Sequence, residues 1–270
     1  MTDHREGWFA AEDPTAAIES GDAAEPRDWP TLALEAGVVD SREAYYDKLH
    51  AVTTAATKRA VERRERADDR QLVHALQAMD DCRSSANELA ERLAEWSGSL
   101  EEDAGTGVEH ARALLEREDV GAHRRRLARR IVDLREDADA LEATIEAEAP
   151  QVAPNLAALA GPVLAARLIA LAGGLESLAK KPSGTVQVLG AEEALFAHLD
   201  GHAPSPKHGV IYTHEAVRGT RPADRGSAAR ALAGKLAIAA RVDHYSGEYR
   251  PTIEADLAER LERIRSRGDT

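Results

Sequence analysis

The chain contains a long stretch without proline or glycine, from Ser41 to Trp96. These two residue types are the strongest helix breakers, so their absence favours one continuous helix with Ser41 as its N-cap. At 1.5 Å per residue this helix would be roughly 80 Å long. Its apolar residues are spaced by threes and fours, and a helix of that length needs a partner along such a stripe. The stretch therefore predicts an all-α fold built on helix pairing.

A second helical segment is expected after a loop over residues 97–107, which reads SGSLEEDAGTG, and Gly121 is expected to interrupt it. Its apolar residues alternate by four and three, the heptad spacing of a coiled-coil seam. Two helices joined by a short loop predict a long antiparallel hairpin. The basic run HRRRLARR at 123–130 is either a solvated face balanced by nearby acids, which we favour, or an RNA contact. The heptad positions are Leu127, Ile131, Leu134, Ala138, Leu141 and Ile145.

A third region begins near Pro150, where Asn155 can cap the next helix. Residues 156–171 are too densely apolar for one wet helix face, so they predict the core of a compact helical domain. Arg167 lies inside this apolar run and is expected to be paired. The predicted parts are an acidic segment at 1–40, the hairpin at 41–149, the compact domain at 150–247, and a helix or tail at 248–270.

The amino-terminal 40 residues hold ten Asp and Glu against Arg5 and Arg27, with prolines that break any long helix. We expect this part to be mostly extended or disordered. Trp8, Phe9 and Trp29 are its large apolar residues. They either pack onto the neighbouring domain or form a docking motif for a partner.

Charge is distributed unevenly along the chain. The net charge is −13, yet residues 155–247 carry ten basic and seven acidic residues, which leaves this segment at +3 and the remainder at −16. This asymmetry indicates a binding surface in the third region. The basic residues comprise six Lys and 29 Arg. An acid-rich, lysine-poor composition predicts a halophilic source, because excess carboxylates keep a protein hydrated at high salt; an acidic mesophile is the alternative.

Cys82 is the only cysteine, which excludes an intrachain disulfide and a multi-cysteine zinc site. Its helical spacing from apolar neighbours favours a small core residue. The amino terminus lacks the pattern of a signal peptide. The longest apolar run, residues 156–172, contains Gly161, Pro162 and Arg167, so it is too short and interrupted to span a bilayer. We expect a cytoplasmic protein without a membrane partner.

Several long blocks of this sequence resemble, in order and spacing, the signature blocks of the Nop domain: GAEEALFAHL, PKHGVIYTH and RGSAARALAGKLAIAARVD. Upstream, APNLAALAGPVLAARLIALAGGLESLAKKP is similar to the entry to that domain, and LVHALQAMDDCRSSANELAERLAEW resembles the family's coiled-coil helix. The resemblance covers roughly residues 40–247. Long blocks in one order are far more specific than a lone short motif.

Resemblance to the archaeal Nop proteins implies a scaffold of box C/D guide ribonucleoproteins. Such a scaffold recognises guide RNA bound by a ribosomal-like kink-turn protein. It also positions fibrillarin, which carries S-adenosylmethionine, for 2′-O-methylation of ribosomal RNA or tRNA. The chain itself would need no cofactor. The hairpin would form a homodimer through the seam residues Leu127, Ile131, Leu134, Leu141 and Ile145.

The same resemblance assigns RNA or ribonucleoprotein contacts to the compact domain. Backbone amides after Gly190 are expected to be open to phosphate, with Lys207 reaching phosphate and His208 stacking on a base. Glu193 and Ala197 depart from the family, which usually has Lys and commonly Arg there. The full set of contacts is Lys180, Lys181, Gln187, Gly190, Ala191, Glu192, Lys207, His208, Arg225, Arg230, Lys235 and Arg241.

Some of these cations have an alternative role, because they could pair with Asp224 or Asp243 in place of RNA. We favour Arg230 and Lys235 as RNA or interface contacts. The family normally carries a larger amino-terminal domain that holds fibrillarin, and this domain is reduced here. We therefore expect residues 1–40 to fold on fibrillarin as an extended clamp through Trp8, Phe9 and Trp29. The competing hypothesis is a coiled-coil dimeric interaction protein with a degenerate Nop-like domain and no role in methylation.

An enzymatic role has little support in the sequence. Ser205, His208, His214 and Asp243 could be imagined as a hydrolytic set, but no nucleophile elbow accompanies them. The histidines at 198, 202, 208 and 214 lack the HExxH helical spacing of a zinc site. We expect no catalytic residue and no bound metal.

Overall fold

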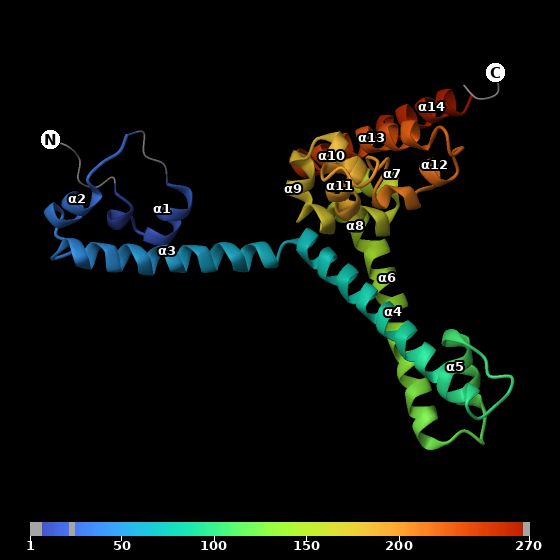
Figure 1. Cartoon of the computed structure of the whole chain (residues 1–270). Helices are drawn as coiled ribbons and strands as arrows, with labels where there is room; N and C mark the ends of the chain where they lie inside the picture. Colours follow the sequence, from blue (N-terminus) through green and yellow to red (C-terminus); the bar gives the residue numbers. More distant parts are fainter. Residues whose placement is uncertain (1–6, 22–24, 267–270) are drawn as a thin grey trace. The chain divides into compact units, whose positions relative to one another are not determined.

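A computed structural model describes residues 7–21 and 25–266, and all regular structure within those ranges is helical (Figure 1). The predicted all-α class is confirmed. The chain divides into two compact units, unit 1 at Met1–Ala67 and unit 2 at Asp68–Thr270.

Unit 1 is folded, and this corrects the expectation of an extended segment. Pro14 and Pro30 stand in the first turn of helices, where proline's missing N–H costs nothing. Asp13 accepts hydrogen bonds from the amides of Thr15 and Ala16, and Asp28 caps the next helix in the same way. The elements are η1 (Trp8–Ala10), α1 (Pro14–Ser20), α2 (Trp29–Glu35) and α3 (Arg42–Glu65).

Aromatic side chains form the core of unit 1. Phe9 and Tyr45 are buried together, and the indole N–H of Trp8 donates to the Tyr45 hydroxyl at 3.2 Å. Trp29 packs edge-on to Phe9, with ring centroids 6.4 Å apart. Phe9 is therefore a core residue and not a docking anchor, whereas Trp8 and Trp29 are half-buried. The extended clamp predicted for this region is wrong for the residues that the structure describes.

The predicted 41–96 helix is two helices. Ser41 is the N-cap, since its hydroxyl accepts from the Ala44 amide at 3.1 Å, but α3 ends at Glu65 and α4 (Asp68–Gly98) begins three residues later. Arginines fill the end of α3 and aspartates begin α4, so each helix dipole meets the opposite charge at this break. Asp69 ties the start of α4 to the rest of unit 2, because its carboxylate accepts from the Leu175 amide at 2.9 Å.

The hairpin of unit 2 pairs α4 with α6 (Ala122–Val152), and α5 (Gly107–Glu116) lies at the tip (Figure 1). Gly121 is the N-cap of α6, as the expected interruption requires. Pro150 lies inside α6, near its end, so the helix runs through the boundary expected at 149/150.

The heptad seam of α6 packs against other helices of the same chain. Ile131 and Ile145 are fully buried, with Ile131 in a tip cluster that includes Leu93 and Ile145 in the main core with Leu76. These two residues are therefore not available to a second copy. Leu127, Leu134 and Leu141 are half-buried.

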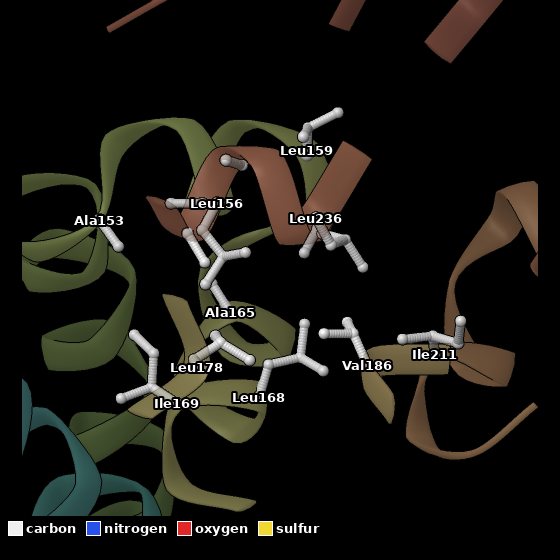
Figure 2. Packing of buried hydrophobic residues seen from close by; sticks show 14 of the residues in the cluster. Ala153, Leu156, Leu159, Ala165, Leu168, Ile169, Leu178, Val186, Ile211 and Leu236 are labelled. Atoms are coloured by element: carbon white, nitrogen blue, oxygen red, sulfur yellow. The ribbon is translucent and has the colours of Figure 1, made fainter. Parts of the chain in front are cut away.

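The remaining helices of unit 2 pack as one body with the base of the hairpin. Figure 2 shows the centre of this core, where Leu156, Leu168, Leu178 and Leu236 from four helices gather. The elements are α7 (Pro154–Ala160), α8 (Pro162–Ala172), α9 (Leu175–Lys180), α10 (Ser183–Val188), α11 (Glu192–Leu199), η2 (Val210–Thr213), α12 (Glu215–Arg218), α13 (Arg225–Tyr245) and α14 (Thr252–Ser266). The carboxy-terminal helix belongs to this core through Ile253, Leu257 and Ile264.

Polar contacts fix the hairpin and the helix ends. Arg167 is paired as expected, donating to both carboxylate oxygens of Asp80 at 2.6 and 2.8 Å. The buried Asp243 accepts from the backbone amides of Asn155 and Leu156, at 3.0 and 2.8 Å, which caps α7. Burial raises the pKa of Asp243, and these hydrogen bonds oppose that shift.

Two further sequence expectations concern apolar residues. Cys82 is partly buried and packs against the main core, as its helical spacing indicates. In the described residues no single helix is long and apolar enough to cross a membrane. The pair α7 and α8, bent by 116°, reaches that length and composition together, and both helices lie in the core of unit 2.

Candidate RNA-binding surface

The loop between α11 and η2 is held in place by the backbone and side chain of Gln187. Its carbonyl accepts from the Gly209 amide at 2.8 Å, and its side-chain amide donates to the Lys207 carbonyl at 2.7 Å. Val210 adds a 2.7 Å bond to the Leu189 carbonyl, and a Cβ at Gly209 would stand 1.9 Å from that oxygen. Gln187, predicted as an RNA contact, therefore positions the backbone of the loop at Lys207.

His208 and Arg225 both contact the ring of Tyr212. The His208 ring stacks on Tyr212 with centroids 4.6 Å apart and planes 24° from parallel. The Arg225 guanidinium lies over the Tyr212 ring at 5.5 Å and donates to the carbonyls of Thr220 and Arg218 at 3.0 and 3.3 Å. This arrangement presents an imidazole with a fixed plane, as stacking on an unpaired base requires.

Lys207 and Arg230 carry the charge of this surface. Both are exposed, and neither has an ion-pair partner within residues 7–21 and 25–266. The aliphatic part of Lys207 lies next to Gly226, with its Cδ 3.9 Å from the place of a Cβ there. Gly226 and Arg230 are one helical turn apart on α13, so Arg230 lies on the face of α13 next to Lys207.

Two amides of the turn at Gly190, those of Gly190 and Ala191, are bound by the chain's own groups. Glu192 accepts from the Gly190 amide at 2.9 Å, and the Ala191 amide donates to the Val188 carbonyl at 3.0 Å. Gly190 has a φ of 78°, which suits glycine and lets the turn close against Val210. The amides of Gly190 and Ala191 are therefore not open to phosphate, Glu192 serves as the cap of this turn, and the prediction remains for the first amides of α11.

Three other predicted RNA contacts have partners in the fold. Lys235 donates to Asp256 of α14 at 2.6 Å, and Arg241 donates to the carbonyls of Ala179 and Lys181 at 3.1 and 3.3 Å. Lys180 pairs with Glu176, one turn before it, and remains exposed. Lys235 and Arg241 thus join helices of unit 2. Neither takes the alternative partners Asp224 and Asp243, because Asp224 pairs with Arg221 and Asp243 caps α7.

Sequence reasoning missed two parts of this surface. Tyr212 organises both His208 and Arg225, and its only signal was its place inside the PKHGVIYTH block. Helix α11 has no buried residue, and Phe196 and Leu199 are 64% and 69% exposed. Exposed apolar side chains grouped on one helix mark a candidate contact surface.

His214 has a structural role. Its Nδ1 accepts from the Ala216 amide at 3.0 Å, which caps α12, and its Nε2 lies 3.0 Å from the Leu159 carbonyl, to which it donates in the neutral ring. Burial lowers the pKa of this imidazole. A groove of about 560 Å³ beside it is lined by the α7–α8 turn, η2 and α12. In the described part of the chain, no group of three or more His, Cys, Asp or Glu is arranged to hold a metal ion.

Comparison with protein families matches residues 52–265 to the family Nop, described as "snoRNA binding domain, fibrillarin". The chain belongs to the Nop family. The match begins within α3, the last helix of unit 1, and ends at residue 265 in α14, so it covers nearly all of unit 2 and only the end of unit 1.

Relatives and a solved structure agree with this membership. The Nop chain is 34% identical to an uncharacterised NOP5 family protein of Methanocaldococcus jannaschii, covering 85% of the chain and 64% of that protein. It is 40% identical to human nucleolar protein 56 over 133 residues, 22% of that protein. It therefore spans less than two thirds of the length of these relatives. A chain from the crystal structure of a fibrillarin/Nop5p complex matches with a TM-score of 0.57 and 28% identity, covering 94% of this chain and 93% of that one.

The buried His214 predicts a pH dependence of stability. Because its folded pKa is lowered below the ordinary value of 6.5, the unfolded chain binds more protons below that pH, and stability falls as the pH drops from 6.5. Burial also lowers the pKa of His110 at the hairpin tip, so this histidine contributes to the same pH dependence. His214→Asn keeps a capping acceptor without a titrating ring. The slope of the unfolding free energy against pH should therefore become smaller, by up to the amount that one proton contributes.

Urea unfolding of unit 2 between pH 7.5 and 5 measures this effect. The matched control is His202→Asn, which removes an exposed histidine of the same unit. An unchanged pH profile in His214→Asn would show that the imidazole stays neutral without cost.

Proposed function

We propose that this Nop chain is the non-catalytic scaffold of a box C/D guide ribonucleoprotein. Unit 2 would recognise guide RNA together with a kink-turn-binding protein, and unit 1 would hold fibrillarin for RNA 2′-O-methylation. The observation that carries this proposal is the rigid loop ending at Gly209, which presents Lys207 and His208 within a family-matched domain. The methyl donor and the chemistry would belong to fibrillarin, and the scaffold itself needs no cofactor.

The distribution of charge supports recognition of RNA jointly with a protein. Lys207 and Arg230 are exposed cations near the loop, whereas Lys235 is engaged in the fold. Two phosphate contacts give little affinity at high salt, since counterion release then contributes little. The exposed Phe196 and Leu199 of α11 offer the protein-facing half of a composite site. A cytoplasm of high salt, inferred from the acid-rich composition, is part of the same proposal.

The alternative of a degenerate Nop-like domain has less support. Glu193 and Ala197 remove two cations from α11, but the loop with Lys207 and His208 is held by its own set of hydrogen bonds. The family match also covers unit 2 up to residue 265, which includes the loop with Lys207 and His208.

The RNA surface is tested with a double substitution, Lys207→Ala with His208→Ala. Losing one phosphate contact and one stacked base should weaken the ternary complex with kink-turn RNA and its protein about tenfold or more. The fold should survive, because the Lys207 carbonyl that Gln187 binds is retained. Electrophoretic mobility shifts at high salt measure the complex, and Lys58→Ala in unit 1 controls for loss of a charge. Equal binding of naked RNA, or an unaffected double variant, contradicts a composite site.

Fibrillarin docking is supported by the extent of the structural match. The two chains cover 94% and 93% of each other, so a Nop5p-complex chain of nearly the same extent accompanies fibrillarin. On unit 1, Tyr46 is 55% exposed and the Arg27 guanidinium lies over the Trp29 ring at 5.7 Å. Arg42 pairs with Asp28 beside this tryptophan. Trp, Tyr and Arg are the residue types that dominate interface energetics.

Tyr46→Ala should weaken fibrillarin pull-down by about tenfold or more while leaving unit 1 folded, because the side chain is outside the core. Phe9→Ala is the contrasting variant, since removing a buried Phe costs about 3–5 kcal/mol and should unfold this small unit. Fluorescence of Trp8 and Trp29 reports the fold of each variant. Fibrillarin capture by a chain lacking residues 1–38 would place the docking face outside the aromatic core of unit 1.

A homodimer through the hairpin is the remaining part of the proposal. Leu134 is half-buried on α6, and Trp96 at the end of α4 is exposed, so apolar surface is left on the hairpin. Leu134→Asp should convert a dimer to a monomer in light scattering at high salt, because an unpaired charge would enter the interface. Ile131→Asp should unfold the hairpin, since Ile131 is buried within the chain. A monomeric wild-type protein would contradict the dimer.

A further inference from the structure

A second cluster of exposed rings and cations lies at the carboxyl end of α13. Tyr245, the last residue of that helix, is 71% exposed, and its ring contacts His244 with centroids 4.7 Å apart. Tyr249, in the segment that follows, is 52% exposed. A group of exposed rings at one place on the surface is a candidate contact site.

The backbone around Tyr249 is fixed. The side chain of Asn155 donates to the Glu248 carbonyl at 2.8 Å and accepts from the Arg250 amide at 2.6 Å. Asn155 is itself buried and held by Asp243. The residue between these two anchors is therefore presented outward by a buried polar network, and its hydroxyl donates to Glu254 of α14. A ring ordered in advance loses little entropy when it binds.

Two lysines at the carboxyl end of α9 accompany the rings: Lys180 is its last residue and Lys181 its C-cap. Arg241, one turn before Tyr245, donates to the carbonyls of Ala179 and Lys181 and so ties the end of α9 to α13. We name this cluster the α13-end patch: Lys180, Lys181, His244, Tyr245 and Tyr249.

We propose that the α13-end patch binds an unpaired segment of RNA by base stacking. Rings beside lysines suit nucleotides, because each base offers a π-face and each linkage a phosphate. Lysine is depleted in the cores of protein interfaces, which makes a protein partner the weaker match. The inference rests on the proposed RNA-binding function and adds a second contact. The patch lies about 30 Å along α13 from Arg225. An RNA bound at the His208 surface would therefore reach the patch only through an unpaired segment that extends beyond the kink-turn.

Stacking rather than charge should dominate at this patch. Lys180 pairs with Glu176, and Arg250 lies 3.8 Å from Glu248, so the local charge is nearly balanced. With the two lysines as phosphate contacts, the salt slope for single-stranded RNA should not exceed about 1.4, from roughly 0.7 per contact. Such a contact tolerates the high salt that the composition of the chain predicts.

The test uses the full chain and two RNA probes in fluorescence anisotropy. The first is an unstructured 12-nucleotide RNA alone, and the second is a kink-turn RNA without unpaired extensions, bound by its kink-turn protein. Tyr245→Ala with Tyr249→Ala should weaken binding of the first probe at least about fivefold and leave the second unchanged. Tyr245→Phe should bind the first probe as the wild type does. Trp96→Ala, which removes an exposed ring from the hairpin, is the matched control.

The outcomes separate this inference from the proposed function. Failure of the wild type to bind the 12-nucleotide RNA, or equal binding by the double variant, overturns the patch even if the kink-turn complex forms. Loss of the kink-turn complex in the wild type overturns the proposed function, while the first probe still decides the patch. If the double variant binds both RNAs normally but loses fibrillarin or the kink-turn protein in pull-downs, the patch is a protein interface and the inference is wrong.

Discussion

The apolar stripe of α4 is the interaction on which unit 2 depends. At the start of the helix, Leu72, Leu76 and Met79 are buried in the main core, where the base of α6 and the helices from α7 onward meet. At its other end, Ala90 and Leu93 are buried in the tip cluster with α5 and α6. One helix therefore supplies part of both cores, and burial of its apolar surface couples the hairpin to the compact domain. The ion pairs of Arg167 with Asp80 and of Arg83 with Glu142 fix the register of this packing.

Given that core, the exposed groups of unit 2 are positioned by hydrogen bonds to loops. Gln187 holds the segment that carries Lys207 and His208, and Asn155 holds the segment that carries Tyr249. Both anchors bind main-chain atoms, so neither uses a side-chain atom of the residues that the segments present. Surface charge alone would bind RNA poorly in the high salt that we infer, because screening weakens phosphate contacts. Stacking on ordered rings and the shape of a fixed loop do not depend on charge, so salt does not weaken their contribution to binding.

Unit 1 is small, and its stability depends on a few aromatic contacts. The rings of Phe9 and Tyr45 are almost fully buried. Arg42 of α3 pairs with the aspartate that caps α2, and Arg59 of α3 pairs with the aspartate that caps α1. Each capping aspartate, Asp13 or Asp28, therefore has two roles: it begins a short helix, and its ion pair holds that helix to α3. Exposed ion pairs contribute little by themselves, so the aromatic core carries the fold of this unit.

The sequence by itself determined the elements whose causes are local. The Ser41 cap, the Gly121 break and the apolar spacing of α4 each depend on neighbouring residues, and the order of the Nop blocks determined the family. Even the short helices of unit 1 had local signals in Asp13-Pro14 and Asp28, which a reading of proline as a helix breaker missed.

Only the tertiary structure decided the roles of individual side chains. Lys235 meets Asp256 and Arg241 meets Ala179, partners 21 and 62 residues away, so no spacing rule could tell these cations from the exposed Lys207 and Arg230. The heptad pattern likewise predicts that Ile131 needs a partner helix, but not whether that helix lies in the same chain. Periodicity fixes which face of a helix is buried, whereas the identity of what covers it depends on how distant segments pack.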